Sequence, residues 1–340
     1  MENLFSTMNS EIENMPEFVH KALTDSNYTH KQKSYIRNIP WTQTICPEID
    51  LPMAESVLEA SHYGMQDVKK QIIRYLACQK HIGKTYGDVL LLVGPPGVGK
   101  TSIAKAIAKA MGREFVKIPL AGVHDAGPLS GYDVNYQNPK PGLIVEGLIS
   151  SKSMCPLILL DEIDKLGGSS SNGYPEHVLL HILDSDRTSF IDDMIQLPID
   201  LSNIVFIATA NNLKDISPIL LDRLNVINLR GYTREEKKKI AISYVIPDLL
   251  EQLKLNEYGI IIEPDVIDYL LEVHKNEAGI RSLKRSIKTL LETYIMKKYL
   301  AGFNVSRITM IEYRQLMEIE NKVKQKKHHT TKTIKTVFND

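Results

Sequence analysis

Residues 89–101 read VLLLVGPPGVGKT, an apolar run followed by a loop rich in glycine and proline. The loop, Gly94–Thr101, matches the pattern GxxxxGKS/T, which holds phosphate groups where it joins a strand to a helix. The apolar run Val89–Val93 predicts that strand, and apolar residues spaced four apart up to Met111 predict that helix. The pattern and its context therefore agree on a phosphate-binding loop.

Phosphate binding explains why these residue types are needed. Successive backbone N–H groups converge on phosphate oxygens, and side chains at the glycine positions would obstruct that approach. Lys100 supplies a mobile charge for the β and γ phosphates, and Thr101 offers its hydroxyl to Mg²⁺. We therefore expect ATP and Mg²⁺ as cofactors, with Thr101 as a metal ligand. The expected nucleotide-binding residues of this loop are Gly94, Pro95, Pro96, Gly97, Val98, Gly99, Lys100, Thr101 and Ser102.

Short apolar runs recur between helical patterns along the chain. They lack strict alternation, which is typical of strands in a parallel sheet buried on both faces. The runs are Val89–Val93, Phe115–Ile118, Leu157–Leu160, Ile204–Ala208 and Val226–Leu229. This alternation of strand and helix predicts an α/β fold, a parallel sheet with helices on both faces. After Gly231 three helical patterns follow, which predict a small all-helical domain.

The length of the chain allows one large domain and a smaller one. Proline residues punctuate the first part of the sequence, which predicts a short extension, and the lysine-rich end predicts a solvated tail. The expected organisation is an N-terminal extension over 1–50, a P-loop ATPase core over 51–230, a helical domain over 231–318 and a basic, disordered tail over 319–340.

Two acids stand at the end of the third apolar run. Asp161 and Glu162 follow Leu157–Leu160 directly, and ligands of parallel sheets bind at the carboxyl ends of the strands. Asp161 is suited to hold Mg²⁺, and Glu162 to orient and deprotonate a water that attacks the γ-phosphate. Asn211 follows the next run and is placed to position that water or to sense the γ-phosphate, although asparagine after a strand is more often a turn residue. Together with the phosphate loop, the acids predict an ATP hydrolase.

Composition argues against several other classes of protein. Lysine plus arginine total 41 against 41 for aspartate plus glutamate, so the chain has no global attraction to nucleic acid or to an anionic membrane. The three cysteines are scattered and lack CxxC spacing, which indicates neither a disulfide framework nor a zinc site. The sequence has no signal-peptide pattern and no apolar run as long as a membrane span. We expect a cytoplasmic protein without a membrane partner.

Beyond these motifs the sequence resembles one family, the ATPase module of Lon proteases in the AAA+ superfamily. The likeness extends from about Pro40 to about Lys298. The stretches that carry it are HYGMQDVK from His62, GPPGVGKTSIAKAIA from Gly94, LLDEIDK from Leu159, FIATANN from Phe206, LLDRLNVINLRGYTREEK from Leu220 and NEAGIRSLKR from Asn276. The resemblance implies an AAA+ core followed by a helical lid, assembled into a homo-oligomeric ring that is a hexamer in Lon.

The resemblance also implies roles for residues outside the phosphate loop. The implied set is His62, Tyr63 and Gly64 beside the adenine, Asn211 as the first sensor, Arg223 as the finger that reaches the ATP of the neighbouring subunit, and Arg281 as the second sensor in the lid. The residues alone leave a local alternative for each arginine. Arg223 would pair within its own surroundings, and Arg281 would lie on a solvated helix face with Lys284 and Lys288.

Tyr136 occupies the place of the aromatic pore-loop residue that grips the substrate polypeptide in this family. The family usually has an aliphatic residue next, whereas this chain has Gln137, a departure that puts peptide gripping in question. Lon also carries a large N-terminal substrate-binding region and a C-terminal peptidase with a Ser/Lys dyad. We expect this chain to lack the peptidase and all but a short remnant of the N-terminal region before Trp41. No GxSxG or HExxH motif in the sequence replaces the peptidase.

The leading hypothesis is an ATP-hydrolysing AAA+ machine that unfolds, translocates or remodels polypeptides without a peptidase site of its own. One alternative is the ATPase subunit of an ATP-dependent protease, which works with a separate peptidase. A second alternative is an AAA+ protein that acts on nucleic acid complexes, for which the basic tail is the only support in the sequence. A third is an ATP-binding switch or scaffold with little turnover.

Overall fold

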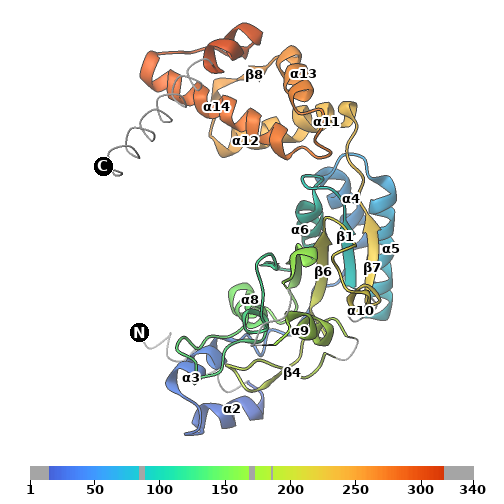
Figure 1. The fold of residues 1–340 in the computed structure, drawn as a ribbon, viewed down its shortest axis with the longest axis vertical. Coiled ribbons are helices and arrows are strands. Elements are labelled where there is room, and N and C mark those ends of the chain that lie inside the picture. The colour runs from blue at the N-terminus through green and yellow to red at the C-terminus, as the bar shows by residue number, and fades with distance from the viewer. Residues whose placement is uncertain (1–14, 84–88, 168–172, 185–186, 318–340) are drawn as a thin grey trace, which may run out of the picture. The chain divides into compact units, whose positions relative to one another are not determined.

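The computed structural model describes residues 15–83, 89–167, 173–184 and 187–317 (Figure 1). The chain divides into two compact units. The first comprises the residues up to Pro95 together with Gly99–Leu229, and the second comprises Pro96–Val98 and the residues from Arg230 onward. The expected basic tail over 319–340 lies outside the described residues.

A five-stranded sheet forms the centre of the first unit. Its strands, in spatial order, are β2 (Phe115–Pro119), β3 (Leu157–Asp161), β6 (Val205–Ala210), β1 (Val89–Val93) and β7 (Leu224–Asn228). Every neighbouring pair in this sheet is parallel, which confirms the predicted α/β fold. β1 and β6 are buried along their whole length, as expected for strands with apolar side chains on both faces.

Helices and short segments pack around this sheet. Several begin at residues that favour a helix start: Asp50 accepts the backbone N–H of Met53 with its carboxylate, and Pro175 opens the helix after it. α6 contacts β2, β3 and β6, and α5 contacts β7. In chain order the elements are α2 (Glu17–Thr24), α3 (His30–Asn38), α4 (Leu51–Ser61), α5 (Gln66–Ile82), α6 (Lys100–Ala110), α7 (Gly127–Ser130), α8 (Leu143–Ser151), η1 (Ile163–Lys165), α9 (Pro175–Ile182), β4 (Phe190–Ile191), β5 (Pro198–Ile199) and α10 (Pro218–Leu221).

The helices α2 and α3, the first two in the described part of the chain, belong to the core of the first unit. Val19 of α2 and Ile36 of α3 are fully buried and lie in the same apolar cluster as Phe206 of β6. Trp41, just after α3, packs edge-on against Phe18 and donates its indole N–H to Ile36 O at 2.7 Å. The segment expected as an N-terminal extension therefore shares a hydrophobic core with the sheet.

The second unit is mainly helical. Thr233 and Glu236 form a capping box at the start of the first helix of this unit, and Gly302 ends the last long helix with φ of 66°. Two short parallel strands, β8 and β9, add to the helices. The sequence pattern did not predict them, because two residues per strand carry no periodicity. The elements are α11 (Arg234–Ile240), η2 (Ala241–Val245), α12 (Ile246–Gln252), η3 (Asn256–Tyr258), β8 (Ile261–Ile262), α13 (Pro264–Val273), α14 (Arg281–Ala301) and β9 (Arg307–Ile308).

The structure also tests two expectations from the sequence, that the cysteines form no disulfide framework and that no segment spans a membrane. Cys46, Cys78 and Cys155 are all free thiols, and Cys155 is buried. Of the helices in the described part of the chain, none is both long and apolar enough to span a bilayer.

Candidate functional site

The order of the sheet brings three strand ends together. β6 lies between β1 and β3, and the three strands run parallel. The phosphate loop follows β1, Asp161 ends β3, and Asn211 follows β6. All three therefore emerge at the carboxyl edge of the sheet, which is where parallel sheets bind their ligands.

The glycines of the phosphate loop are required by its backbone. Gly97 and Gly99 have φ of 80° and 100°, in the left-handed region that favours glycine. Gly99 is the N-cap of α6, so the first turn of that helix presents its backbone N–H groups toward the loop. At Gly94 the reason is packing, because a Cβ would lie 2.3 Å from the carbonyl oxygen of Leu229. The loop thus has the conformation and the donors that anion binding needs.

Lys100 connects the loop to the neighbouring strand end. The residue is only 9% exposed. Its ammonium group donates to Gly94 O at 2.6 Å, to Pro95 O at 3.1 Å and to Asn211 Oδ1 at 2.9 Å. The residue predicted as first sensor therefore contacts the residue predicted to bind the β and γ phosphates, although the two are far apart in the sequence.

Three carboxylates act on the charge of Lys100. Burial lowers the pKa of the Lys100 ammonium, and the nearby side chains of Asp164, Asp161 and Glu162 oppose that shift. An electrostatic effect of this kind requires proximity. The acid pair that follows β3 therefore lies beside the phosphate loop, which is the association on which the nucleotide hypothesis depends.

Thr209 of β6 joins the two predicted acids. Its hydroxyl donates to Asp161 Oδ1 at 2.5 Å and accepts the backbone N–H of Glu162 at 2.9 Å. The second oxygen of Asp161 pairs with Lys117 Nζ of β2 at 2.6 Å. Glu162 has φ of 59°, a conformation that costs a non-glycine residue about 1–3 kcal/mol. The hydrogen bond from the Glu162 backbone N–H to Thr209 helps to hold Glu162 in this strained conformation, and such strain is frequent at active sites.

Asp164 is a third acid at the site, to which the sequence interpretation gave no role. It is 4% exposed, and its Oδ2 accepts the backbone N–H of Asn211 at 3.1 Å. Its Oδ1 is buried and has no hydrogen-bond partner among the described residues. A buried oxygen without a partner costs free energy, so this atom is placed to accept a further donor at the site.

His62 lies beside the N-terminus of α6. Its Nε2 is 2.9 Å from Ser102 Oγ, and its Nδ1 is 2.8 Å from Ser61 Oγ. Burial lowers the pKa of His62 to about 4, so its imidazole is neutral near pH 7. The adjacent Tyr63 and Gly64 form the turn between α4 and α5, with Gly64 at φ of 69°. The stretch implied to lie at the adenine side is therefore next to the phosphate loop.

Comparison with known proteins agrees with this geometry. Residues 90–232 match the family described as ATPase family associated with various cellular activities (AAA). The chain belongs to the AAA ATPase family. Within this family its sequence is similar to that of Lon proteases, as the sequence resemblance indicated.

Three relatives of this AAA chain illustrate the match. The Lon protease of Desulforamulus reducens is 40% identical over 292 residues, which cover 86% of this chain and 35% of that protein. The Lon protease of Mycoplasma genitalium is 37% identical over 89% of this chain and 39% of its own length. The mitochondrial Lon protease homolog of Yarrowia lipolytica is 36% identical over 87% of this chain and 25% of its own length. The chain thus spans well under half the length of these relatives.

Arg223 is the residue of the AAA chain implied to act on a neighbouring subunit. It follows α10, and its Nη2 lies 3.4 Å from Asp184 Oδ2 with both side chains partly exposed. An ion pair in that setting contributes little free energy. Within the described residues no hydrogen bond or ion pair joins the Arg223 guanidinium to the phosphate loop.

Arg281 is the first residue of α14 in the second unit. Pro96–Val98, the tip of the phosphate loop, belongs to the same unit, and within it Ile280 donates its backbone N–H to Gly97 O at 3.1 Å. A Cβ built on Gly97 would lie 3.0 Å from the Cβ of Arg281. The residue implied as second sensor of the AAA fold therefore lies beside the tip of the loop.

Tyr136 lies in the loop between α7 and α8 and is 50% exposed. Its ring centre is 5.6 Å from that of Tyr132. The neighbouring Gln137 is also exposed. Tyr136, the aromatic residue predicted to contact polypeptide, is therefore accessible to solvent. Its loop is separate in the sequence from the phosphate-binding residues.

Proposed function

We propose that the chain binds ATP with Mg²⁺ at the carboxyl edge of its sheet and hydrolyses the γ-phosphate. The observation that carries this proposal is the convergence of Lys100 and Asn211 with the carboxylates of Asp161, Glu162 and Asp164. One ammonium group on a glycine-rich loop, with several acids from a neighbouring strand end beside it, supplies the donors and ligands that a magnesium nucleotide requires. Membership of the AAA ATPase family supports nucleotide binding.

The residues present fit a magnesium nucleotide. Thr101 at the start of α6 and Asp161 at the end of β3 would hold the metal. When bound, Mg²⁺ neutralises negative charge on the phosphates. Asp161 already pairs with the half-exposed ammonium of Lys117, and the buried oxygen of Asp164 lacks a partner in the described structure. Both observations support a site whose acids are arranged for positive charge.

In this proposal Glu162 orients the attacking water and takes its proton. The hydrogen bond from its backbone N–H to the Thr209 hydroxyl fixes the position of the Glu162 backbone, from which the side chain extends. Asn211 is held from two sides, by Lys100 at its side chain and by Asp164 at its backbone. These contacts support a rigid arrangement of the hydrolytic groups, which catalysis by positioning requires.

ATP turnover in this proposal drives the unfolding, translocation or remodelling of polypeptides by a homo-oligomeric ring of six subunits. The relatives described as Lon proteases and the exposed aromatic ring of Tyr136 support this part. The partly exposed guanidinium of Arg223, which pairs with Asp184 at 3.4 Å, supports action on a neighbour.

Measurements of nucleotide binding and ATP turnover by the purified chain test the nucleotide part. Lys100→Ala should abolish tight nucleotide binding. Glu162→Gln should bind ATP but lose turnover by about 10²–10⁴-fold, the usual contribution of a general base. A Lys100→Ala protein that keeps full nucleotide affinity and hydrolysis would overturn the proposed site.

Addition of an unfolded protein tests the polypeptide part. Turnover of the unmodified chain should rise in its presence, and Tyr136→Ala should reduce that rise. If unfolded protein leaves turnover unchanged in both proteins, the chain is an ATPase with another task.

A further inference from the structure

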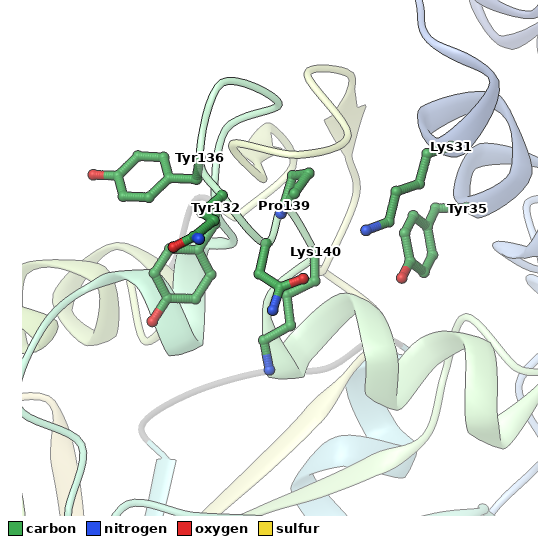
Figure 2. Close-up of a pocket in the computed structure, with 8 residues that line it drawn as sticks. Lys31, Tyr35, Tyr132, Tyr136, Pro139 and Lys140 are labelled. Carbon is green, nitrogen blue, oxygen red and sulfur yellow. The ribbon is translucent and has the colours of Figure 1, made fainter.

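A cavity of about 600 Å³ lies in the first unit between α3 and the loop that carries Tyr136 (Figure 2). Lys31 and Tyr35, one helical turn apart on α3, form one wall. Tyr132, Tyr136 and Gln137–Lys140 form the other wall. The volume is within the range of sites that enclose a ligand.

Both walls are fastened to one segment of the chain, residues 192–196. On the helix side, Gln32 of α3 is 2% exposed, and its side-chain amide donates to Met194 O at 3.1 Å. On the loop side, Gly142 donates its backbone N–H to the fully buried carboxylate of Asp192 at 2.7 Å. The two walls therefore share an anchor, which fixes the distance between them.

Further hydrogen bonds hold the loop wall in place. Tyr132 donates its backbone N–H to Lys140 O at 2.9 Å, which closes the loop. Gln196 donates from its side chain to Asp133 Oδ2 at 3.2 Å, which ties the loop again to the shared segment. A site with walls held in this way loses less conformational entropy when a ligand binds.

The cavity is cationic and aromatic. Lys31 and Lys140 contribute ammonium groups, and in the part of the chain that the structure describes neither has an acidic partner. Figure 2 shows the Lys31 side chain pointing from α3 toward the loop. Three tyrosine rings and Pro139 supply apolar surface, and none of the lining residues is acidic. The complementary ligand therefore combines negative charge with apolar groups.

We infer that this cavity binds a polypeptide segment in which acidic side chains stand beside aromatic or large apolar ones. Carboxylates of the segment pair with Lys31 and Lys140, and its apolar side chains pack on the tyrosine rings. A nucleic acid fits less well, because a phosphate chain needs cations along its length and only two line the cavity. The inference rests on the proposed function and specifies which polypeptide segments the chain binds. It also adds α3 to the surface that contacts the substrate.

Fluorescence anisotropy with two labelled, unstructured peptides of equal length tests this inference on the full chain. One peptide alternates acidic residues with phenylalanine, and the other carries lysine in place of each acid. The unmodified chain should bind the acidic peptide more tightly. Lys31→Glu should weaken binding of the acidic peptide by about threefold to fivefold or more, as for one partly exposed ion pair, and should strengthen binding of the basic peptide.

Lys33→Glu is the matched control, because Lys33 lies on the same helix and does not line the cavity. It should leave both affinities and ATP turnover unchanged. The reversed preference of Lys31→Glu separates a lost contact from a misfolded protein, which would weaken both peptides together.

Three outcomes overturn the inference. Equal binding of both peptides would show that the cavity has no preference for acidic segments, and so would a Lys31→Glu variant that keeps the original preference. Neither result would contradict ATP turnover or its stimulation by unfolded protein. Displacement of the acidic peptide by single-stranded DNA, with DNA binding lost in Lys31→Glu, assigns the cavity to nucleic acid instead. Failure of the proposed function has a different signature, namely the absence of ATP turnover in the unmodified chain.

Discussion

The hydroxyl of Thr209 on β6 bonds to both acids of the proposed site, Asp161, which would hold the metal, and Glu162, which would activate the water. Thr209→Val tests whether hydrolysis depends on these two hydrogen bonds. Valine keeps the shape of threonine but neither accepts the Glu162 N–H nor donates to Asp161. Loss of a partner that orients a metal ligand usually costs about 10–100-fold in activity or metal affinity. We expect turnover to fall by about that factor, and the Mg²⁺ concentration for half-maximal turnover to rise.

Thr293→Val is a control of equal type and similar burial, since Thr293 is 7% exposed and its hydroxyl donates to Thr289 O of its own helix. Its turnover should stay within about twofold of the unmodified chain, as for substitutions away from a site. Unchanged turnover and Mg²⁺ dependence in Thr209→Val would remove the bridge from the mechanism.

The buried imidazole of His62 predicts a pH dependence of stability. Its folded pKa is about 4 against an ordinary value of 6.5, so between these values the unfolded chain binds the extra proton. Stability is therefore fully present above pH 6.5 and is lost as the pH falls toward 4, by up to about 3 kcal/mol. Urea unfolding at pH 7 and at pH 5 measures this loss. His62→Gln should lose less stability over that interval than the unmodified chain, whereas His81→Gln, at an exposed position, should lose as much.

The sequence identified only part of the proposed site, for physical reasons. The phosphate loop and the acid pair stand next to apolar runs, so their patterns locate them at strand ends. Thr209 and Lys117 meet Asp161 across neighbouring strands, and apolar periodicity reports burial rather than cross-strand pairing. Asp164 gave a local signal, since it stands three residues after Asp161 in DEID, yet only the turn η1 brings it back to Asn211.

At the scale of elements, the loop that carries Tyr136 depends on one buried side chain. Asp192 accepts backbone N–H groups from Gly142, Met194 and Ile195 at 2.7–3.1 Å. Asp192→Ala leaves these three donors without their acceptor, and each unsatisfied buried donor costs about 1–3 kcal/mol. We expect the free energy of unfolding to fall by about 3 kcal/mol or more, measured by urea denaturation, and the loop to become sensitive to limited proteolysis.

The neighbouring acid provides the comparison. Asp193 is exposed, and within the described residues its carboxylate accepts one hydrogen bond, from the Ser130 hydroxyl at 3.1 Å. Asp193→Ala should change stability by about 0.5 kcal/mol or less, as for most surface substitutions. Equal effects of the two substitutions would show that the loop does not depend on the buried carboxylate.

Elements differed in how well the sequence predicted them. The five strands of the sheet were located to within about two residues, because fully buried strands require apolar residues throughout. For the loop after Tyr132, the sequence predicted a role for Tyr136 but not the conformation of the loop. Its shape comes from side chains that bond to backbone atoms far along the chain, such as Asp192 to Gly142, and no local pattern encodes such bonds.

At the scale of the whole molecule, the proposed ring makes each site depend on two subunits. Lys100 serves the nucleotide of its own chain, whereas Arg223 has no bond to the phosphate loop of its own described chain and is proposed to serve a neighbour. Lys100→Ala and Arg223→Ala should each abolish turnover when alone. A mixture of the two should regain activity, because an Arg223→Ala subunit keeps an intact pocket that a Lys100→Ala neighbour completes. At equal amounts, random head-to-tail assembly leaves roughly a quarter of the sites complete.

Steady-state ATP turnover of the mixed proteins, after subunit exchange, measures this recovery. The control replaces the Lys100→Ala partner by a chain with both substitutions, which has no arginine to donate and should restore nothing. Recovery with the first partner and none with the second requires that Arg223 acts across a subunit boundary. No recovery with either partner would mean that Arg223 acts within its own chain. An Arg223→Ala protein that keeps its turnover when alone would mean that Arg223 has no part in hydrolysis, and its pair with Asp184 would then be its structural role.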